Sequence, residues 1–170
     1  MDDTTRLREH RLVFYRDDIA RIDLLLKELI QLSGAHAALL VDREGHLVSK
    51  VGDLRSVDSD TIAALVAGSF AATRELARVL GEEQFSVVFH QGRRDSIQLT
   101  LAGDRTILTV LFDDSTTVGM VRIYTNEAGK KLGDLFTEIE SRDDSETPDV
   151  GMASDFDENA KSRLDTLFPD

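Results

Sequence analysis

The chain has 170 residues, of which 41% are hydrophobic, so it is long and apolar enough for one domain with a core and tails. Its formal net charge of −12 argues against nucleic acid as a partner, because phosphate binding needs a basic surface. It contains no cysteine, which excludes disulfides, thiolate catalysis and cysteine zinc sites.

The first part of the chain predicts a helix followed by a hairpin. Apolar residues recur at helical spacing from Ile19 to Leu32. Gly34 follows as a natural helix stop, because glycine adopts the left-handed conformation at little cost. Residues 35–41 form a nearly continuous apolar run, and residues 46–51 follow after a turn, so the two segments predict a β-hairpin.

A long second helix is predicted for residues 59–80. Asp58 is a suitable N-cap, Gly81 is a suitable stop, and no proline lies between them. We expect the side facing the sheet to be an apolar stripe, which contains Ile62, Leu65, Ser69, Leu76 and Leu80. A second stripe begins with small side chains and ends with charged ones: Ala64, Ala67, Gly68, Ala71, Arg74, Glu75 and Arg78.

Three further strands and a third helix complete the pattern. Residues 85–90 and 96–101 are rich in β-formers or alternate between apolar and polar side chains. Residues 106–112 form the most apolar segment, which we expect to lie at the centre of an antiparallel meander. Apolar residues at helical spacing in 118–139 predict the last helix, whose start is less sharply marked than its end.

This order of elements, α-β-β-α-β-β-β-α, predicts an α/β sandwich with helices on both faces of a five-stranded, mostly antiparallel sheet. The expected domain covers residues 13–141, after a flexible N-terminus at 1–12. Residues 142–170 hold both prolines and few apolar residues, and Asp143 to Asp170 contain nine acids against two bases, so we expect a largely disordered tail. Within it, segment 156–168 is either a docking element or part of a solubilising tail; its apolar cluster is Leu164, Leu167 and Phe168.

Motifs for catalysis or cofactor binding are missing from the sequence. The four histidines have no metal-ligand spacing, and they are His10, His36, His46 and His90. Neither phosphate-binding glycine motif nor a GxSxG elbow occurs. We therefore predict no catalytic residue, no cofactor and no metal. No apolar run approaches the length of a membrane span, and the acidic start is unlike a signal peptide, so we expect a cytoplasmic protein without membrane insertion.

Two features point to protein partners instead. Small side chains on the second helix let another backbone approach closely, which indicates a contact surface, although alanines also occur simply as good helix formers. The strand at 85–90 has no charged residue or proline to protect it as a sheet edge. We expect it to pair with a second copy in a symmetric homodimer, through Phe85, Val87, Val88 and Phe89.

Three stretches carry a resemblance to a known family. They are Ile62 to Gly68 (IAALVAG), Gly81 to Gly92 (GEEQF and FHQG), and Phe112 to Arg122 (FD and VGMVR). Together with the order of elements, they resemble Roadblock/LC7 domains of the MglB type, the bacterial partners of the small Ras-like GTPase MglA. The resemblance covers roughly residues 12–139, and the Leu-Phe ending of the tail is similar to that of some MglB chains.

The resemblance implies a homodimer with a continuous sheet, whose paired second helices bind one MglA-like small GTPase, preferably in its GTP-bound form. It also implies faster GTP hydrolysis through reshaped switch regions, with the catalytic arginine and glutamine supplied by the GTPase, in cell polarity or gliding motility. Such a protein would be cytoplasmic and concentrated at a cell pole. Two positions depart from the family pattern, Ser115 and Glu75, and both could change which GTPase is accepted. A non-catalytic scaffold or localisation adaptor is the alternative.

Overall fold

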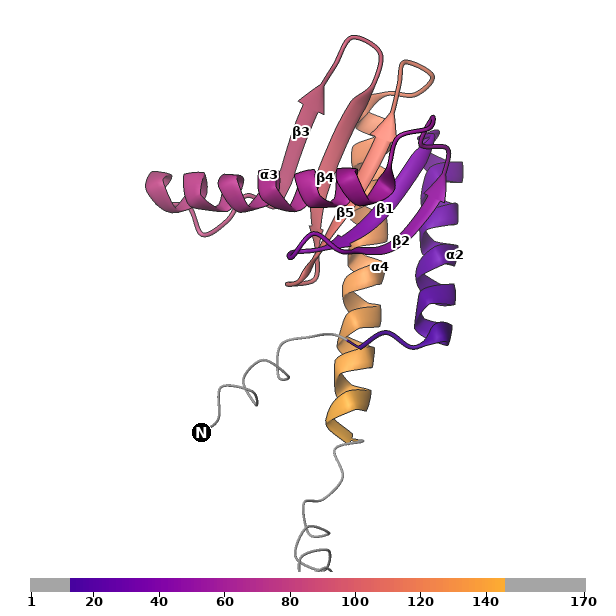
Figure 1. The fold of residues 1–170 in the computed structure, drawn as a ribbon, viewed down its shortest axis with the longest axis vertical. Coiled ribbons are helices and arrows are strands. Elements are labelled where there is room, and N and C mark those ends of the chain that lie inside the picture. Colours follow the sequence, from indigo (N-terminus) through magenta and orange to yellow (C-terminus); the bar gives the residue numbers. More distant parts are fainter. Residues whose placement is uncertain (1–12, 146–170) are drawn as a thin grey trace, which may run out of the picture. The chain divides into compact units, whose positions relative to one another are not determined.

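The computed structural model describes the backbone of residues 13–145 and the side chains of residues 13–142. Its elements follow the expected order (Figure 1). They are α2 (Arg16–Ser33), β1 (Ala37–Asp42), β2 (Leu47–Gly52), α3 (Ser59–Leu80), β3 (Val87–Gln91), β4 (Ser96–Ala102), β5 (Thr106–Phe112) and α4 (Val118–Ser145). None of the described helices is long and apolar enough to cross a membrane.

The five strands form one sheet in the order β2-β1-β5-β4-β3, and every neighbouring pair is antiparallel. β5 lies at the centre, as its apolar sequence predicts, and all seven of its residues are buried. β2 and β3 form the two edges. The predicted α/β sandwich is therefore confirmed, with a fully antiparallel sheet.

Helices cover both faces of this sheet, α3 on one and α2 with α4 on the other (Figure 1). Successive side chains of a strand point to opposite faces, so the central strands need apolar residues at nearly every position. The core beneath α2 and α4 includes Leu26, Leu40, Leu108, Val110, Leu132 and Ile139. The core beneath α3 includes Leu39, Ala63, Val66, Phe70, Leu99 and Ile107.

α3 begins and ends where the sequence predicts. The Asp58 carboxylate caps the helix by accepting a hydrogen bond from the Thr61 backbone N–H at 2.9 Å. A hydrogen bond from the Thr61 hydroxyl and, next in size, this backbone bond lower the pKa of Asp58. Gly81 closes the helix with a φ of 76°. Both ends are thus fixed by local chemistry.

The side of α3 that faces the sheet differs from the expected stripe. Leu65, Leu76 and Leu80 are 69%, 54% and 62% exposed, so the prediction that they face the sheet was wrong. The buried side carries smaller or other residues: Ala63, Val66, Ala67, Phe70 and Ala77. α3 also projects past β3 (Figure 1), so its last turns have no strand beneath them on which leucines could pack.

Substitution of two glycines should separate backbone strain from steric conflict. Gly52 and Gly81 both have positive φ values, 93° and 76°. A Cβ on Gly52 would lie 2.2 Å from the His36 carbonyl oxygen, whereas a Cβ on Gly81 would meet nothing within 4 Å. We expect Gly81→Ala to lower the free energy of unfolding by about 1 kcal/mol and Gly52→Ala by roughly twice that or more, measured by urea denaturation. Equal losses of unfolding free energy in the two variants would contradict a steric conflict between the added Cβ at Gly52 and the His36 carbonyl.

Candidate functional site

The stripe of small and charged residues on α3 is largely free for contact. Ala64, Gly68 and Ala71 are exposed, and a Cβ on Gly68 would meet nothing within 4 Å. Arg74, Glu75 and Arg78 follow along the same region and are exposed as well. Within this stripe, Arg78 donates to Glu75 at 2.9 Å. The structure therefore brings these six residues to the surface, as the sequence predicts.

Ala67 differs from the rest of the stripe because it is only 7% exposed. The turn between β1 and β2 packs against this part of α3: a Cβ added to Gly45 would lie 3.2 Å from the Ala64 Cα and 3.5 Å from the Ala67 Cβ. A small side chain at Ala67 is thus needed for packing within the domain, whereas the approach at Ala64 is to its backbone. Ala64, Gly68 and Ala71 form the exposed part of the small-residue surface.

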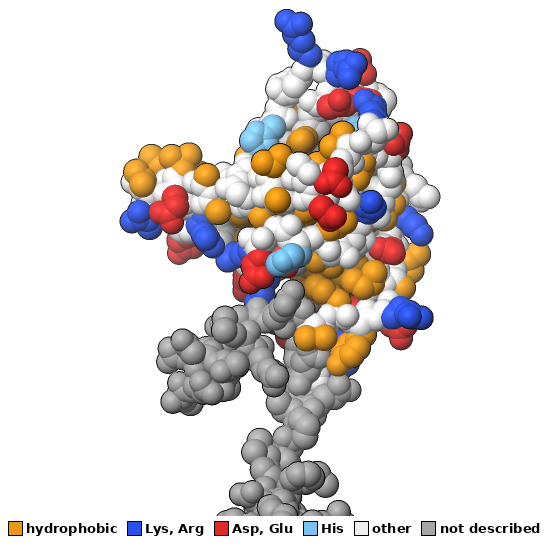
Figure 2. Space-filling view, in the orientation of Figure 1, with side chains coloured by type: hydrophobic (Ala, Val, Ile, Leu, Met, Phe, Trp, Pro, Cys, Tyr) orange, Lys and Arg blue, Asp and Glu red, His pale blue; other side chains and the backbone are white. Residues whose placement is uncertain are grey.

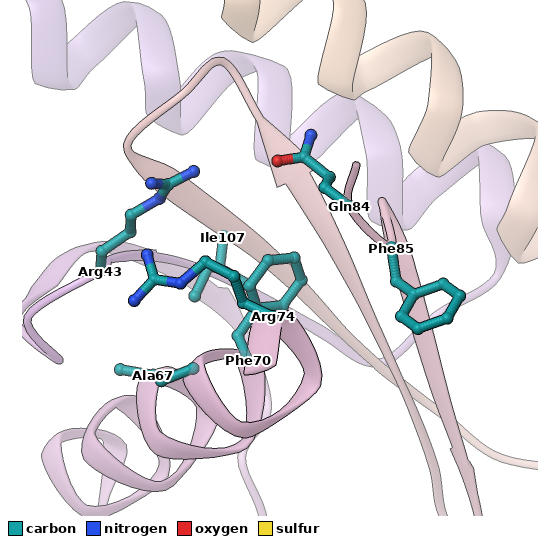
Figure 3. A pocket seen from close by; sticks show the side chains of 8 residues that line it. Arg43, Ala67, Phe70, Arg74, Gln84, Phe85 and Ile107 are labelled. Atoms are coloured by element: carbon teal, nitrogen blue, oxygen red, sulfur yellow. The ribbon is translucent and has the colours of Figure 1, made fainter. Parts of the chain in front are cut away.

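A pocket lies between α3, the turn before β2 and the segment before β3 (Figure 3). Its apolar lining comes from Ala67, Phe70, Ala71, Phe85 and Ile107, and its polar lining from Arg43, Arg74 and Gln84. Phe85 therefore lies outside the strand, in the wall of this pocket, because β3 begins only at Val87. The expectation that Phe85 belongs to the edge strand was wrong.

The other flank of α3 and the edge of the sheet form a second exposed surface. Hydrophobic side chains gather on the projecting end of α3 (Figure 2), where Leu76, Val79 and Leu80 are 54%, 73% and 62% exposed. In the part of the chain that the structure describes, β3 pairs only with β4, so its other side is open. Val87, Val88 and Phe89 are half-buried on this edge. Exposed apolar residues beside an open edge are typical of a surface that another chain covers.

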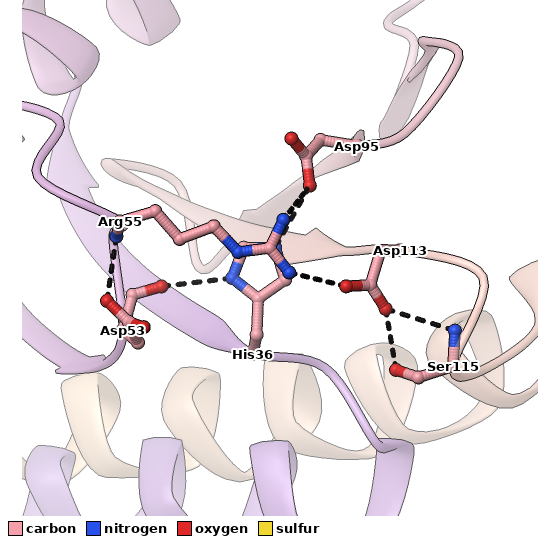
Figure 4. Close-up of polar contacts among 6 residues, drawn as sticks. All are labelled: His36, Asp53, Arg55, Asp95, Asp113 and Ser115. Carbon is pink, nitrogen blue, oxygen red and sulfur yellow. Dashed lines mark hydrogen bonds and ion pairs between the residues drawn. The ribbon is translucent and has the colours of Figure 1, made fainter.

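Figure 4 shows a polar cluster that the sequence did not predict. Its residues lie just before β1 and β4 and just after β2 and β5. Arg55 donates to Asp95 at 2.8 Å and to Asp113 at 2.5 Å. His36 lies beside them, with Nδ1 3.0 Å from the Asp53 carbonyl oxygen. Arg55 thus links the loop after β2 to the turn before β4 and the loop after β5.

Metal binding is one chemistry to test against this cluster. The ligand atoms of His36, Asp95 and Asp113 lie within 4.8 Å of one another. The Arg55 guanidinium binds both carboxylates, however, so it already balances one of their two negative charges. Another such group, Asp42, Glu44 and His46, lies on the turn after β1, where Asp42 accepts backbone N–H bonds from the other two. Both groups are therefore explained by hydrogen bonding within the fold.

Ser115, one of the two departures from the family pattern, has a local role in this cluster. Its hydroxyl and its backbone N–H donate to one oxygen of Asp113, at 2.6 and 3.0 Å, while Arg55 donates to the other oxygen. The positive charge next to Asp113 thus comes from the loop after β2. In that loop Arg55 and Ser56 have φ values of 51° and 67°, a conformation that non-glycine residues adopt only when surrounding contacts hold it.

The predicted docking element at 156–168, with Leu164, Leu167 and Phe168, lies outside the described residues.

Comparison with known proteins identifies the fold. The family model of the Roadblock/LC7 domain matches residues 21–112, which is more than half of the chain. The chain belongs to the Roadblock/LC7 family. Its solved relatives include Myxococcus xanthus MglB, with 34% identity, 75% of this chain and 96% of that chain covered, and a TM-score of 0.71.

Two other solved structures agree with this assignment. The gliding protein MglB of Thermus thermophilus is 35% identical, with the same coverage and a TM-score of 0.69. A structure described as MglB with tetrameric arrangement is 34% identical, again with the same coverage and a TM-score of 0.70. This chain is therefore an MglB-like Roadblock/LC7 protein.

The Asp113 cluster predicts how stability depends on pH. Hydrogen bonds from Ser115, followed by that from Arg55, hold the pKa of Asp113 well below its usual range. A carboxylate whose pKa is lower in the folded state stabilises the fold above the unfolded pKa of about 4, and this contribution is lost as pH falls. We expect Asp113→Asn to lower Tm at pH 7 but to differ much less from the wild type near pH 2. The exposed neighbour Asp114→Asn is the control, and a Tm deficit of Asp113→Asn that is independent of pH would contradict this role.

Proposed function

We propose that this chain, as a homodimer, binds an MglA-like small Ras-like GTPase and promotes GTP hydrolysis by remodelling its switch regions. The single observation that carries the proposal is the open small-residue surface at Gly68 and Ala71 on α3, in a domain 34–35% identical to MglB. The GTP-bound form is the preferred partner. The role in motility is supported by the description of the Thermus relative as a gliding protein.

Homodimer formation is proposed through β3 and the apolar flank of α3. Antiparallel pairing of two β3 strands would satisfy the open backbone groups of the edge and produce one continuous sheet. The projecting ends of both α3 helices would then cover part of the partner copy and bury Leu76, Val79 and Leu80. The tetrameric arrangement described for an MglB relative supports self-association in this family.

The proposed GTPase contact uses Ala64, Gly68 and Ala71, flanked by the charged residues at 74, 75 and 78. Gly68 and Ala71 present backbone to a partner at close range, because their side chains are absent or small. No group on this surface is proposed to take part in the chemistry. Stimulation would arise because the dimer binds the hydrolysis-competent conformation of the GTPase more tightly than other conformations. The proposed location is the cytoplasm, with concentration at a cell pole.

Arginine on the small-residue surface should abolish GTPase binding and leave the dimer intact. Ala71→Arg and Gly68→Arg place a long, charged side chain at exposed positions, and the second change also removes a glycine that weakens the helix. We expect affinity for the cognate GTPase, loaded with a non-hydrolysable GTP analogue, to fall by about two orders of magnitude, a loss of roughly 2.7 kcal/mol. Light scattering should still report the wild-type mass.

The matched control is Ala20→Arg, which adds the same charge at an exposed position of α2. Retained binding by both α3 variants would contradict the proposed surface. Phosphate release with saturating protein tests the activity itself. Binding without any stimulation would favour the non-catalytic scaffold or localisation adaptor over a GTPase-activating protein.

Acidic side chains on the apolar flank of α3 should dissociate the dimer. In Leu76→Glu/Leu80→Glu, two exposed apolar side chains that the dimer would bury become charged, and burying unpaired charges is costly. We expect multi-angle light scattering to report the mass of a monomer. Leu24→Glu/Ile123→Glu makes the same change at positions 65% and 61% exposed on α2 and α4, and should keep the wild-type mass. A dimer that survives the first pair of changes would place the interface elsewhere.

A further inference from the structure

Two arginines share the rim of the α3 pocket. Arg43 comes from the turn after β1 and Arg74 from α3, and their guanidinium groups lie on the same side of the pocket (Figure 3). Within the described part of the chain, neither guanidinium has an ion pair or a side-chain hydrogen bond, whereas Arg55 and Arg78 each bind an acid. Two like charges on one rim repel each other, and an anion bound between them would remove this repulsion.

The rest of the pocket is apolar. Phe70 and Ile107 are 7% and 1% exposed, and Phe85 is half-buried in the wall. A simple inorganic anion would leave this apolar surface unused. The pocket instead suits a segment that lays an apolar side chain along this lining and places carboxylates beside it. Guanidinium groups are suited to carboxylates because they can donate two parallel hydrogen bonds.

Two phenylalanines near the end of the sequence, Phe156 and Phe168, have carboxylates on both sides, and only Phe168 also has leucines within the four residues before it, Leu164 and Leu167. Residues 164–170 read Leu-Asp-Thr-Leu-Phe-Pro-Asp, so Phe168 has carboxylates three residues before it and two residues after it. The sequence from Asp143 to Asp170 contains nine acidic and two basic residues. Its net negative charge is therefore complementary to the two arginines of the pocket. We propose that the α3 pocket of one copy binds residues 164–170 of a second copy, with Phe168 against the apolar lining and Asp165 and Asp170 at the two arginines.

This contact would regulate the GTPase surface. The pocket includes Ala71 and Arg74, which also belong to the surface proposed for the GTPase, so segment and GTPase would compete. Only this consequence rests on the proposed function. Binding of the segment itself depends on the pocket and its arginines, and it can be measured without any GTPase.

A labelled peptide tests the contact in trans. The probe is a fluorescein-labelled peptide of residues 156–170, titrated with the full chain carrying Leu164→Ala/Leu167→Ala/Phe168→Ala, so that its own segment does not compete. We expect fluorescence anisotropy to give a Kd on the order of 10 μM in low salt. Arg43→Ala/Arg74→Ala in the same background should weaken binding at least about tenfold. Arg93→Ala/Arg94→Ala removes two exposed arginines from the turn between β3 and β4, and should change the Kd less than about twofold.

Peptide variants separate this mode from simple charge attraction. A Phe168→Ser peptide keeps every charge and should bind at least about tenfold more weakly, because the apolar contact is lost. No binding at millimolar protein, equal losses in the two double-arginine variants, or unchanged binding of the Phe168→Ser peptide would each overturn the proposal. Binding of the peptide to the GTPase and not to this chain would do so as well. Failure of the chain to bind any GTPase would overturn the proposed function but leave this contact standing.

Discussion

Close packing of α3 on the sheet decides which surfaces this domain can offer to a partner. Ala63 is fully buried between the helix and the sheet, and the β1–β2 turn approaches so closely that a Cβ on Gly45 would lie 3.2 Å from the Ala64 Cα. The buried side combines alanines with Val66 and Phe70, and the leucines of α3 lie on the flanks. Leu76 and Leu80 are consequently exposed on the end that projects past β3.

The two edges of the sheet differ in how well they can pair with another strand. Both faces are covered by helices, so the sheet can grow only at β2 or β3. The edge at β2 carries the exposed Lys50 in its middle and pairs with β1 through an irregular register near Leu40 and Val41. Both features discourage the addition of another strand. β3 has no charged residue to protect its edge. The same edge lies next to α3, whose exposed leucines also need to be covered.

Local chemistry explains why much of the fold could be predicted from the sequence. Asp58 and Gly81 mark the ends of α3 because a cap and a left-handed stop act within one turn. The sequence predicts β5 as the central strand because a strand covered on both faces is apolar at nearly every position. The burial side of α3 could not be predicted in the same way. Its apolar residues form two possible stripes, and only the approach of the β1–β2 turn and the edge of the sheet selects between them.

The spacing of residues along the sequence could not predict the polar cluster around Arg55. Arg55 meets Asp95 and Asp113 across separations of 40 and 58 residues, from three different loops, so their contact depends on the register of the whole sheet. Phe85 was misplaced for a related reason, because a β-forming residue before a strand can either extend it or fill a neighbouring pocket. At the candidate surface, exposed Gly68 and Ala71 were predicted because a glycine and an alanine outside the buried side have a recognisable spacing.

The proposed division of labour places a thermodynamic requirement on this surface. A protein without a reacting group can accelerate hydrolysis only by as much as it prefers the competent conformation of its partner. A hundredfold shift in that conformational equilibrium needs about 2.7 kcal/mol of differential binding, which two or three well-packed contacts supply. Gly68 and Ala71 suit this task because close backbone approach discriminates strongly between loop conformations. An acidic segment in the adjoining pocket would oppose the same shift by occupying the surface, so the proposed contact at the two arginines would connect partner selection to self-association.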